Sequence, residues 1–199
     1  MSKIKVVATG FRGMLILEEF LKMNLHDIDS VLIAKYETNF HHSSAKIKIA
    51  VGEDEIYWYC RVNNPQRVEK FAINHSDEIF SALEDAEFIL GITDLGDNDG
   101  EGIPPVIADV AQKIGAPIIF VAFTPFKMSP YREECARECL FKLEERAVSV
   151  MQLDEIYLVK LVPPKTKFYE GYMMMMKFAA QDVKNILDCY VSRSFALST

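Results

Sequence analysis

One stretch of the chain, residues 86–126, constrains the fold more than any other part of the sequence. It contains an apolar run at 87–92, a glycine-rich turn, a helical pattern over 104–114 and a second apolar run at 117–123. Two prolines open the helical pattern, where proline is tolerated, and Gly115 follows its last residue. Strand, helix and strand in this order predict two parallel strands joined by a crossover helix.

The same alternation runs along the rest of the chain. Apolar runs predict further strands at 4–8, 30–34, 45–51, 55–62 and 155–161. The runs at 45–51 and 55–62 are compatible with a hairpin around 52–54. Helical periodicity predicts helices at 14–23, 65–83, 130–147 and 168–192, with a turn at 9–13 before the first. We expect one α/β domain over residues 1–199, with three layers: a mainly parallel sheet and helices on both of its faces.

Composition excludes several classes of protein. A net charge of −7 gives no support to nucleic-acid binding, which needs a basic surface. No apolar run approaches the length of a membrane span, and the N-terminus lacks the pattern of a signal peptide. The four cysteines form no CxxC pair. These features favour a cytoplasmic protein with free thiols.

The glycine-rich turn, residues 94–102, carries four carboxylates and is called the acidic segment below. A glycine-rich turn that opens a helix typically binds an anion through backbone N–H groups. Here Asp94, Asp97, Asp99 and Glu101 oppose that role. Two unit charges roughly 5 Å apart repel by about 3 kcal/mol at an effective dielectric constant of about 20. A solvated turn is the favoured interpretation; a Mg²⁺ or Ca²⁺ site on Asp97, Asp99 and Glu101 is the less favoured one.

In order and spacing, these segments resemble the GTPase domain of FtsZ, the bacterial relative of tubulin. Residues 105–126 are similar to the family's helix, strand and T-x-P-F turn, and residues 4–20 to its first strand, glycine loop and helix. Residues 153–159 resemble a later strand, and 179–183 resemble the central helix. The resemblance covers essentially the whole chain. It implies a tubulin-like, Rossmann-like nucleotide-binding fold.

The resemblance also implies where a nucleotide would bind, as a vestigial or weak site. Its candidate residues are Gly10, Arg12, Gly13, Gly96, Asn98, Gly100, Gly102 and Gln181. The family's GGGTG[TS]G signature falls on 96–102, where acids and an amide replace several positions. In the first loop, Phe11 and Leu15 stand where the family has small or amide residues.

These departures predict a relative that has lost GTP hydrolysis. The family continues past its central helix into an acidic loop that completes the next subunit's site, whereas this chain stops at Thr199. We therefore assign no catalytic residue, expect no enzymatic activity and no cofactor, and predict an assembly or regulatory protein-interaction module. Its partner would be an FtsZ-like subunit or a second copy of the chain. The alternative is a protein that binds GTP or GDP, or a GTPase with altered loops completed by a partner chain.

The run Met173–Met176 carries a separate prediction. Methionine side chains adapt to irregular cores, so we expect them to pack a central helix against the sheet. A partner-binding surface is the alternative.

Overall fold

The computed structural model describes residues 4–25, 27–52, 64–125 and 129–197. Within these residues one six-stranded sheet has the order β3-β2-β1-β4-β5-β6, and every neighbouring pair is parallel. The strands are β1 (Ile4–Thr9), β2 (Ile28–Ala34), β3 (Ile47–Ala50), β4 (Phe88–Asp94), β5 (Ile118–Thr124) and β6 (Ser149–Asp154). The α/β fold with a parallel sheet, predicted from the sequence, is confirmed.

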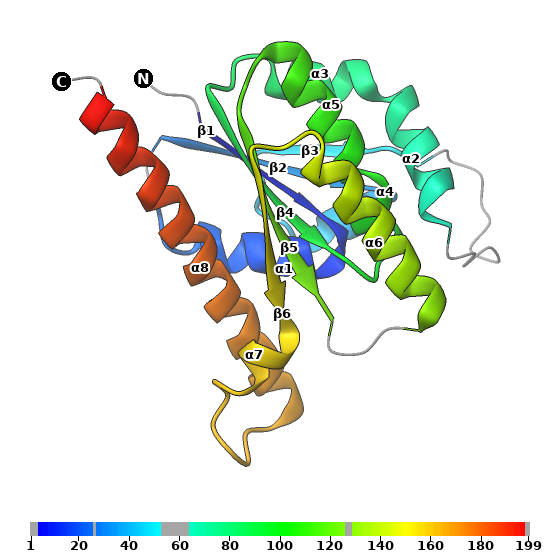
Figure 1. The fold of residues 1–199 in the computed structure, drawn as a ribbon. Coiled ribbons are helices and arrows are strands. Elements are labelled where there is room, and N and C mark those ends of the chain that lie inside the picture. Colours follow the sequence, from blue (N-terminus) through cyan, green and yellow to red (C-terminus); the bar gives the residue numbers. More distant parts are fainter. Residues whose placement is uncertain (1–3, 26, 53–63, 126–128, 198–199) are drawn as a thin grey trace.

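Helices connect the strands and cover both faces of the sheet (Figure 1). They are α1 (Gly10–Leu21), α2 (Pro65–Asn74), α3 (Ser76–Leu83), α4 (Asn98–Gly102), α5 (Pro104–Ile114), α6 (Pro130–Glu144), α7 (Glu155–Val159) and α8 (Phe168–Leu197), with a 3₁₀ helix, η1 (Glu37–His42), after β2. In the described part of the chain, no helix is long and apolar enough to cross a lipid bilayer.

Most predicted elements lie within a few residues of their observed bounds. The predicted helix at 104–114 coincides with α5. The predicted helix at 65–83 is two helices that meet at His75. The predicted turn at 9–13 is wrong, because α1 begins at Gly10. The run 45–51 contains β3, but its neighbour is β2, in parallel. The predicted hairpin partner, 55–62, lies outside the described residues.

The predicted strand at 155–161 is wrong. The sixth strand is β6, one segment earlier, and 155–159 form the short helix α7. β6 lies at an edge of the sheet, where it pairs only with β5 and leaves several side chains exposed, so it lacks the apolar character of a central strand. The apolar residues of α7 are mostly exposed, and Leu158 alone among them is buried.

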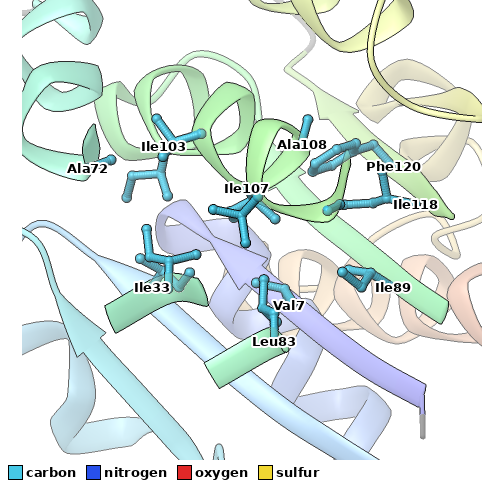
Figure 2. Close-up of a cluster of buried hydrophobic side chains, with 14 of the residues drawn as sticks. Val7, Ile33, Ala72, Leu83, Ile89, Ile103, Ile107, Ala108, Ile118 and Phe120 are labelled. Atoms are coloured by element: carbon cyan, nitrogen blue, oxygen red, sulfur yellow. The ribbon is translucent and has the colours of Figure 1, made fainter. Parts of the chain in front are cut away.

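Alternation along the strands builds two hydrophobic cores. On β1, Val7 points into the core beneath α2, α3, α5 and α6, whereas Val6 and Ala8 point into the core beneath α1 and α8. Figure 2 shows the first core, in which Ile107 of α5 lies over the sheet near Val7 and Ile33. Both faces of the sheet are therefore covered by hydrophobic side chains and shielded from solvent, as is typical of a parallel sheet.

The second core contains part of the methionine run. Met175 and Met176 are buried in it, together with small residues of α8 that let this helix lie close to α1. The predicted core packing is confirmed for these two residues. Met173 and Met174 are only partly buried.

The parallel arrangement brings the carboxyl ends of the strands to one edge of the sheet. β1 and β4 are neighbours in register, with Thr9 opposite Thr93. The Thr9 hydroxyl donates to the Thr93 hydroxyl oxygen at 3.0 Å. Helix α1 starts directly after β1, and the acidic segment begins at the end of β4. The start of α1, which is the first loop of the sequence analysis, therefore meets the acidic segment, although the residues in contact are 82 and 86 positions apart in sequence.

We expect Gly91→Ala to destabilise the fold by about 1–3 kcal/mol, because an added Cβ on β4 would lie 2.4 Å from the buried ring of Phe120. Phe120→Leu removes the ring and should relieve part of that cost. Urea denaturation of the two single variants and the double variant measures the coupling. Strictly additive free energies would contradict this packing. Gly115→Ala serves as the control for coupling: no atom lies within 4 Å of its added Cβ, so its cost should come from backbone strain at φ +75° and should add independently to that of Phe120→Leu.

Candidate functional site

The candidate site lies where β1 and β4 end and α1 and α4 begin. Gly10, the first residue of α1, has φ +76°, which favours glycine. A Cβ added there would lie 2.9 Å from the Cβ of Asp94. Glycine at this position therefore lets the backbone of the first loop approach the acidic segment closely.

Asp94 and Arg12 form the buried centre of this contact. The Asp94 Oδ2 accepts the Arg12 backbone N–H at 3.1 Å, and its Oδ1 accepts the Arg12 Nε–H at 2.7 Å. The guanidinium also lies over the ring of Phe123, 5.1 Å from its centroid. Burial raises the pKa of Asp94 to about 7, and Asp97 adds to this rise, while Arg12 opposes it. Arg12 thus holds the end of β4 to the start of α1.

Asp97 contacts the same helix end. Its Oδ2 accepts the Phe11 backbone N–H at 3.1 Å, next to the Arg12 N–H that Asp94 takes. The first N–H groups of a helix have no partner within the helix and carry partial positive charge. Thr9, the N-cap residue, makes no side-chain capping hydrogen bond. Two carboxylates of the acidic segment therefore bind the donors that a phosphate would use.

The other two carboxylates hold α4 against neighbouring elements. Asp99 Oδ2 accepts the Lys35 N–H at 2.8 Å, at the end of β2. Glu101 accepts the Gly96 N–H at 2.9 Å and pairs with Arg132 of α6, also at 2.9 Å. Asp99 is 6% exposed and Glu101 3% exposed. The interpretation of this segment as a solvated turn is therefore wrong: of its four acids, only Asp97 is partly exposed.

The glycines of the acidic segment are required by packing. A Cβ on Gly100 would lie 1.8 Å from the backbone oxygen of Asp94, and one on Gly102 would lie 2.5 Å from that of Pro65. Gly96 has φ +101°. Gly13, one turn into α1, would bring a Cβ to 3.1 Å from the Ile92 oxygen. The glycine spacing of this segment resembles that of a phosphate loop, but here it allows α4 to pack closely between β4 and α2.

Two candidate residues of the nucleotide site, Gln181 and Asn98, remain. Gln181 is exposed on α8, and its Nε2 donates to Asn185 Oδ1 at 3.1 Å. The Asn98 side-chain oxygen is buried with no hydrogen-bond partner among the described residues. Asp97, Asp99 and Glu101 bind three different backbone N–H groups, and nowhere in the described ranges is a group of three or more His, Cys, Asp or Glu placed to hold a metal ion. The nucleotide and metal assignments stay predictions.

The sequence did not identify every residue that builds the site. Asp94 was counted among the repelling acids, yet it anchors Arg12. Lys35 and Arg132 were not assigned, although each binds a carboxylate of α4. Only Asp94 had a usable signal, since a charged residue at the end of a buried strand lies at the carboxyl edge of the sheet.

We expect Asp99→Asn to stabilise the protein at pH 8 by about 1–3 kcal/mol. Burial raises the pKa of Asp99 from 3.8 to about 7, so its contribution to stability is present below pH 3.8 and is lost as the pH rises through 7. Asparagine keeps an oxygen for the Lys35 N–H without the buried charge. Thermal melts at pH 6 and pH 8 test this, with Glu87→Gln, at an exposed carboxylate, as the control. A variant that is less stable than the wild type at pH 8 would contradict it.

No protein-family model matches the chain. Among curated proteins, it is 26% identical over 184 residues to cell division protein FtsZ 2 of Halobacterium salinarum, covering 92% of this chain and 47% of that protein. It is 27% identical over 188 residues to cell division protein FtsZ of Methanothermobacter thermautotrophicus, covering 94% and 49%. The chain thus spans about half the length of the curated relatives it matches.

Known structures show the same fold. An empty FtsZ dimer of M. jannaschii superimposes with a TM-score of 0.84 at 24% identity, covering 94% of this chain and 55% of that one. CetZ from Methanosaeta thermophila gives 0.77 at 18% identity, covering 94% and 54%. A TubZ protofilament of bacteriophage PhiKZ gives 0.68 at 14% identity, covering 96% and 56%. The chain thus has the fold of the FtsZ/tubulin GTPase domain and is similar in sequence to FtsZ proteins.

Proposed function

We propose that this domain acts in protein assembly or its regulation, without hydrolysing GTP. The observation that carries the proposal is the use of the α1 N-terminus by the protein's own carboxylates. Asp97 accepts the Phe11 N–H and Asp94 accepts the Arg12 N–H. A nucleotide phosphate at this point would need both donors and would meet two carboxylates.

The residues as placed do not fit a triphosphate. Asp94 is buried and paired with Arg12. Moving the Asp94 side chain away from the phosphate site would therefore break this ion pair and leave the guanidinium unpaired. Phe11, 55% exposed, stands at the start of the helix. Phosphoryl transfer depends on positioning the phosphates and neutralising their charge. An acidic segment that points inward neither positions the phosphates nor neutralises their charge. This supports a role that does not depend on GTP turnover.

The proposed partner is an FtsZ-like subunit or a second copy of the chain. One similar structure is an FtsZ dimer and another is a TubZ protofilament. Head-to-tail assembly uses two different surfaces of each subunit. We propose that the edge carrying Phe11 and Asp97 is one such surface, with Asp97 contributing the negative charge that a bound phosphate would otherwise supply. Contacts of this kind depend on salt concentration.

A guanine-nucleotide-binding protein is the second candidate, and one observation favours it. Asp97 is the only partly exposed carboxylate of the four, and it is held at the first loop by its bond to Phe11 N–H. A partner chain that drew Asp97 away would free that N–H for an anion. The site would then be completed in a complex and not by this chain alone.

We expect calorimetry with GTP and Mg²⁺ at moderate salt to detect no binding by the wild-type chain, corresponding to a Kd weaker than about 1 mM. Asp97→Gly should bind at least about tenfold more tightly, because it frees the Phe11 N–H and removes one charge. Asp97→Asn, which retains an oxygen acceptor, is the matched control and should gain less. Micromolar binding by the wild type would refute the proposal in favour of the second candidate.

We expect Asp97→Lys to weaken association with a second copy or with purified FtsZ, while the melting temperature stays within a few degrees of the wild type. The reason is that Asp97 is partly exposed, unlike the buried Asp99 and Glu101. Sedimentation velocity at low and high salt measures the association. If neither salt nor this substitution changes the association, the interface does not include Asp97 and the proposed surface is wrong.

A further inference from the structure

A cluster of exposed apolar side chains lies at the end of the sheet beside β6. It occupies residues 156–169, which include most of α7, the connection to α8 and the first two residues of α8, and it is called the aromatic–lysine tip below. In Figure 1 the connection projects beyond the ends of the strands at the bottom of the molecule. The tip is thus a convex protrusion.

The exposure of its large side chains is unusual. Phe168 is 89% exposed, Tyr169 72%, Tyr157 63% and Leu161 59%. Ile156 and Val159 on α7 are exposed as well. Exposed apolar residues that occur singly need no explanation, whereas a contiguous group marks an interaction surface.

The charge of the tip is opposite to that of the protein. Residues 156–169, between Glu155 and Glu170, contain Lys160, Lys165 and Lys167 and no acid, in a chain with a net charge of −7. All three lysines are exposed. Lys160 lies over the ring of Tyr157, 5.3 Å from its centroid. Lys167 has only a 4.0 Å contact with Glu170, between two exposed side chains, which is worth little in water.

The tip is held in place by its own contacts. Val162 packs against the second core, and a Cβ on Gly171 would lie 3.1 Å from its Cγ1. The Thr166 N–H and hydroxyl both donate to the Pro163 oxygen, at 3.3 and 2.7 Å, and close a turn. The Phe168 ring stacks near Tyr172. The apolar side chains are therefore displayed by an ordered backbone.

We propose that the aromatic–lysine tip docks on an anionic lipid surface. Aromatic side chains with polar ends favour the membrane–water interface, and lysines beside them are attracted to anionic headgroups. Protein interfaces also favour aromatic residues, but they are depleted in lysine and enriched in arginine. The tip contains no arginine. Its convex shape and its excess positive charge fit a headgroup layer better than a protein surface.

This proposal is independent of the proposed function. The tip follows β6, the last strand of the sheet, whereas the acidic segment follows β4, two strands away. The two surfaces can therefore be changed separately. Asp97→Asn should leave lipid binding unchanged, and substitutions in the tip should leave unchanged the association that Asp97→Lys is expected to weaken.

Co-sedimentation with vesicles tests the proposal. The full chain should bind vesicles of equimolar phosphatidylcholine and phosphatidylglycerol, and bind phosphatidylcholine alone much more weakly. Lys165→Ser with Lys167→Ser should weaken binding about fivefold per lysine. Phe168→Ser with Tyr169→Ser should weaken it more than about tenfold. The positions are exposed, so thermal melts should show the fold retained.

A matched control uses Phe141 and Lys113, an exposed phenylalanine and an exposed lysine on α6 and α5. Phe141→Ser with Lys113→Ser should leave vesicle binding unchanged. The proposal is overturned if the wild type does not bind anionic vesicles, or if the control reduces binding as much as the tip variants. It is also overturned if the tip variants only convert a self-associated wild type into monomers, because the tip would then be a protein interface.

Discussion

The first backbone N–H groups of α1 determine the structure of the candidate site. They are strong donors at the positive end of a helix, and they must find acceptors. In this protein the acceptors are the carboxylates of Asp94 and Asp97, which come from the end of β4. The buried ion pair between Asp94 and Arg12 then fixes the two loops together. The N–H groups of the α1 N-terminus, which could bind an anionic ligand, thereby donate to carboxylates of the same chain.

The inward orientation of the acidic segment follows from this contact. Gly10 and Gly100 allow the loops to approach within van der Waals distance of each other, and Gly102 allows α4 to lie against α2. Once α4 lies there, Asp99 and Glu101 are buried and need partners, which Lys35 and Arg132 provide. Burial nonetheless raises the pKa of both carboxyls. Asp99 and Glu101 are therefore buried in the folded protein although burial disfavours their ionised forms.

The sequence was sufficient for the fold because strand and helix patterns are local. The helix 104–114 has its prolines and its Gly115 at the ends, and it is correct to the residue. The sixth strand was misplaced because the apolar run at 155–161 is more strand-like than the exposed edge strand beside it. The burial of Asp99 and Glu101 could not be predicted, since it depends on Lys35 and Arg132, which are distant in sequence. Composition alone indicated a solvated turn.

The nucleotide content of the purified chain tests the central claim most directly. Protein prepared without added nucleotide is denatured, and the released guanine nucleotide is quantified by chromatography against the protein concentration. If the carboxylates of Asp94 and Asp97 occupy the α1 N-terminus in solution, the released nucleotide should be close to zero per chain. Release of nearly one GDP or GTP per chain would contradict the account, because the acidic segment would then have to lie outside the phosphate site.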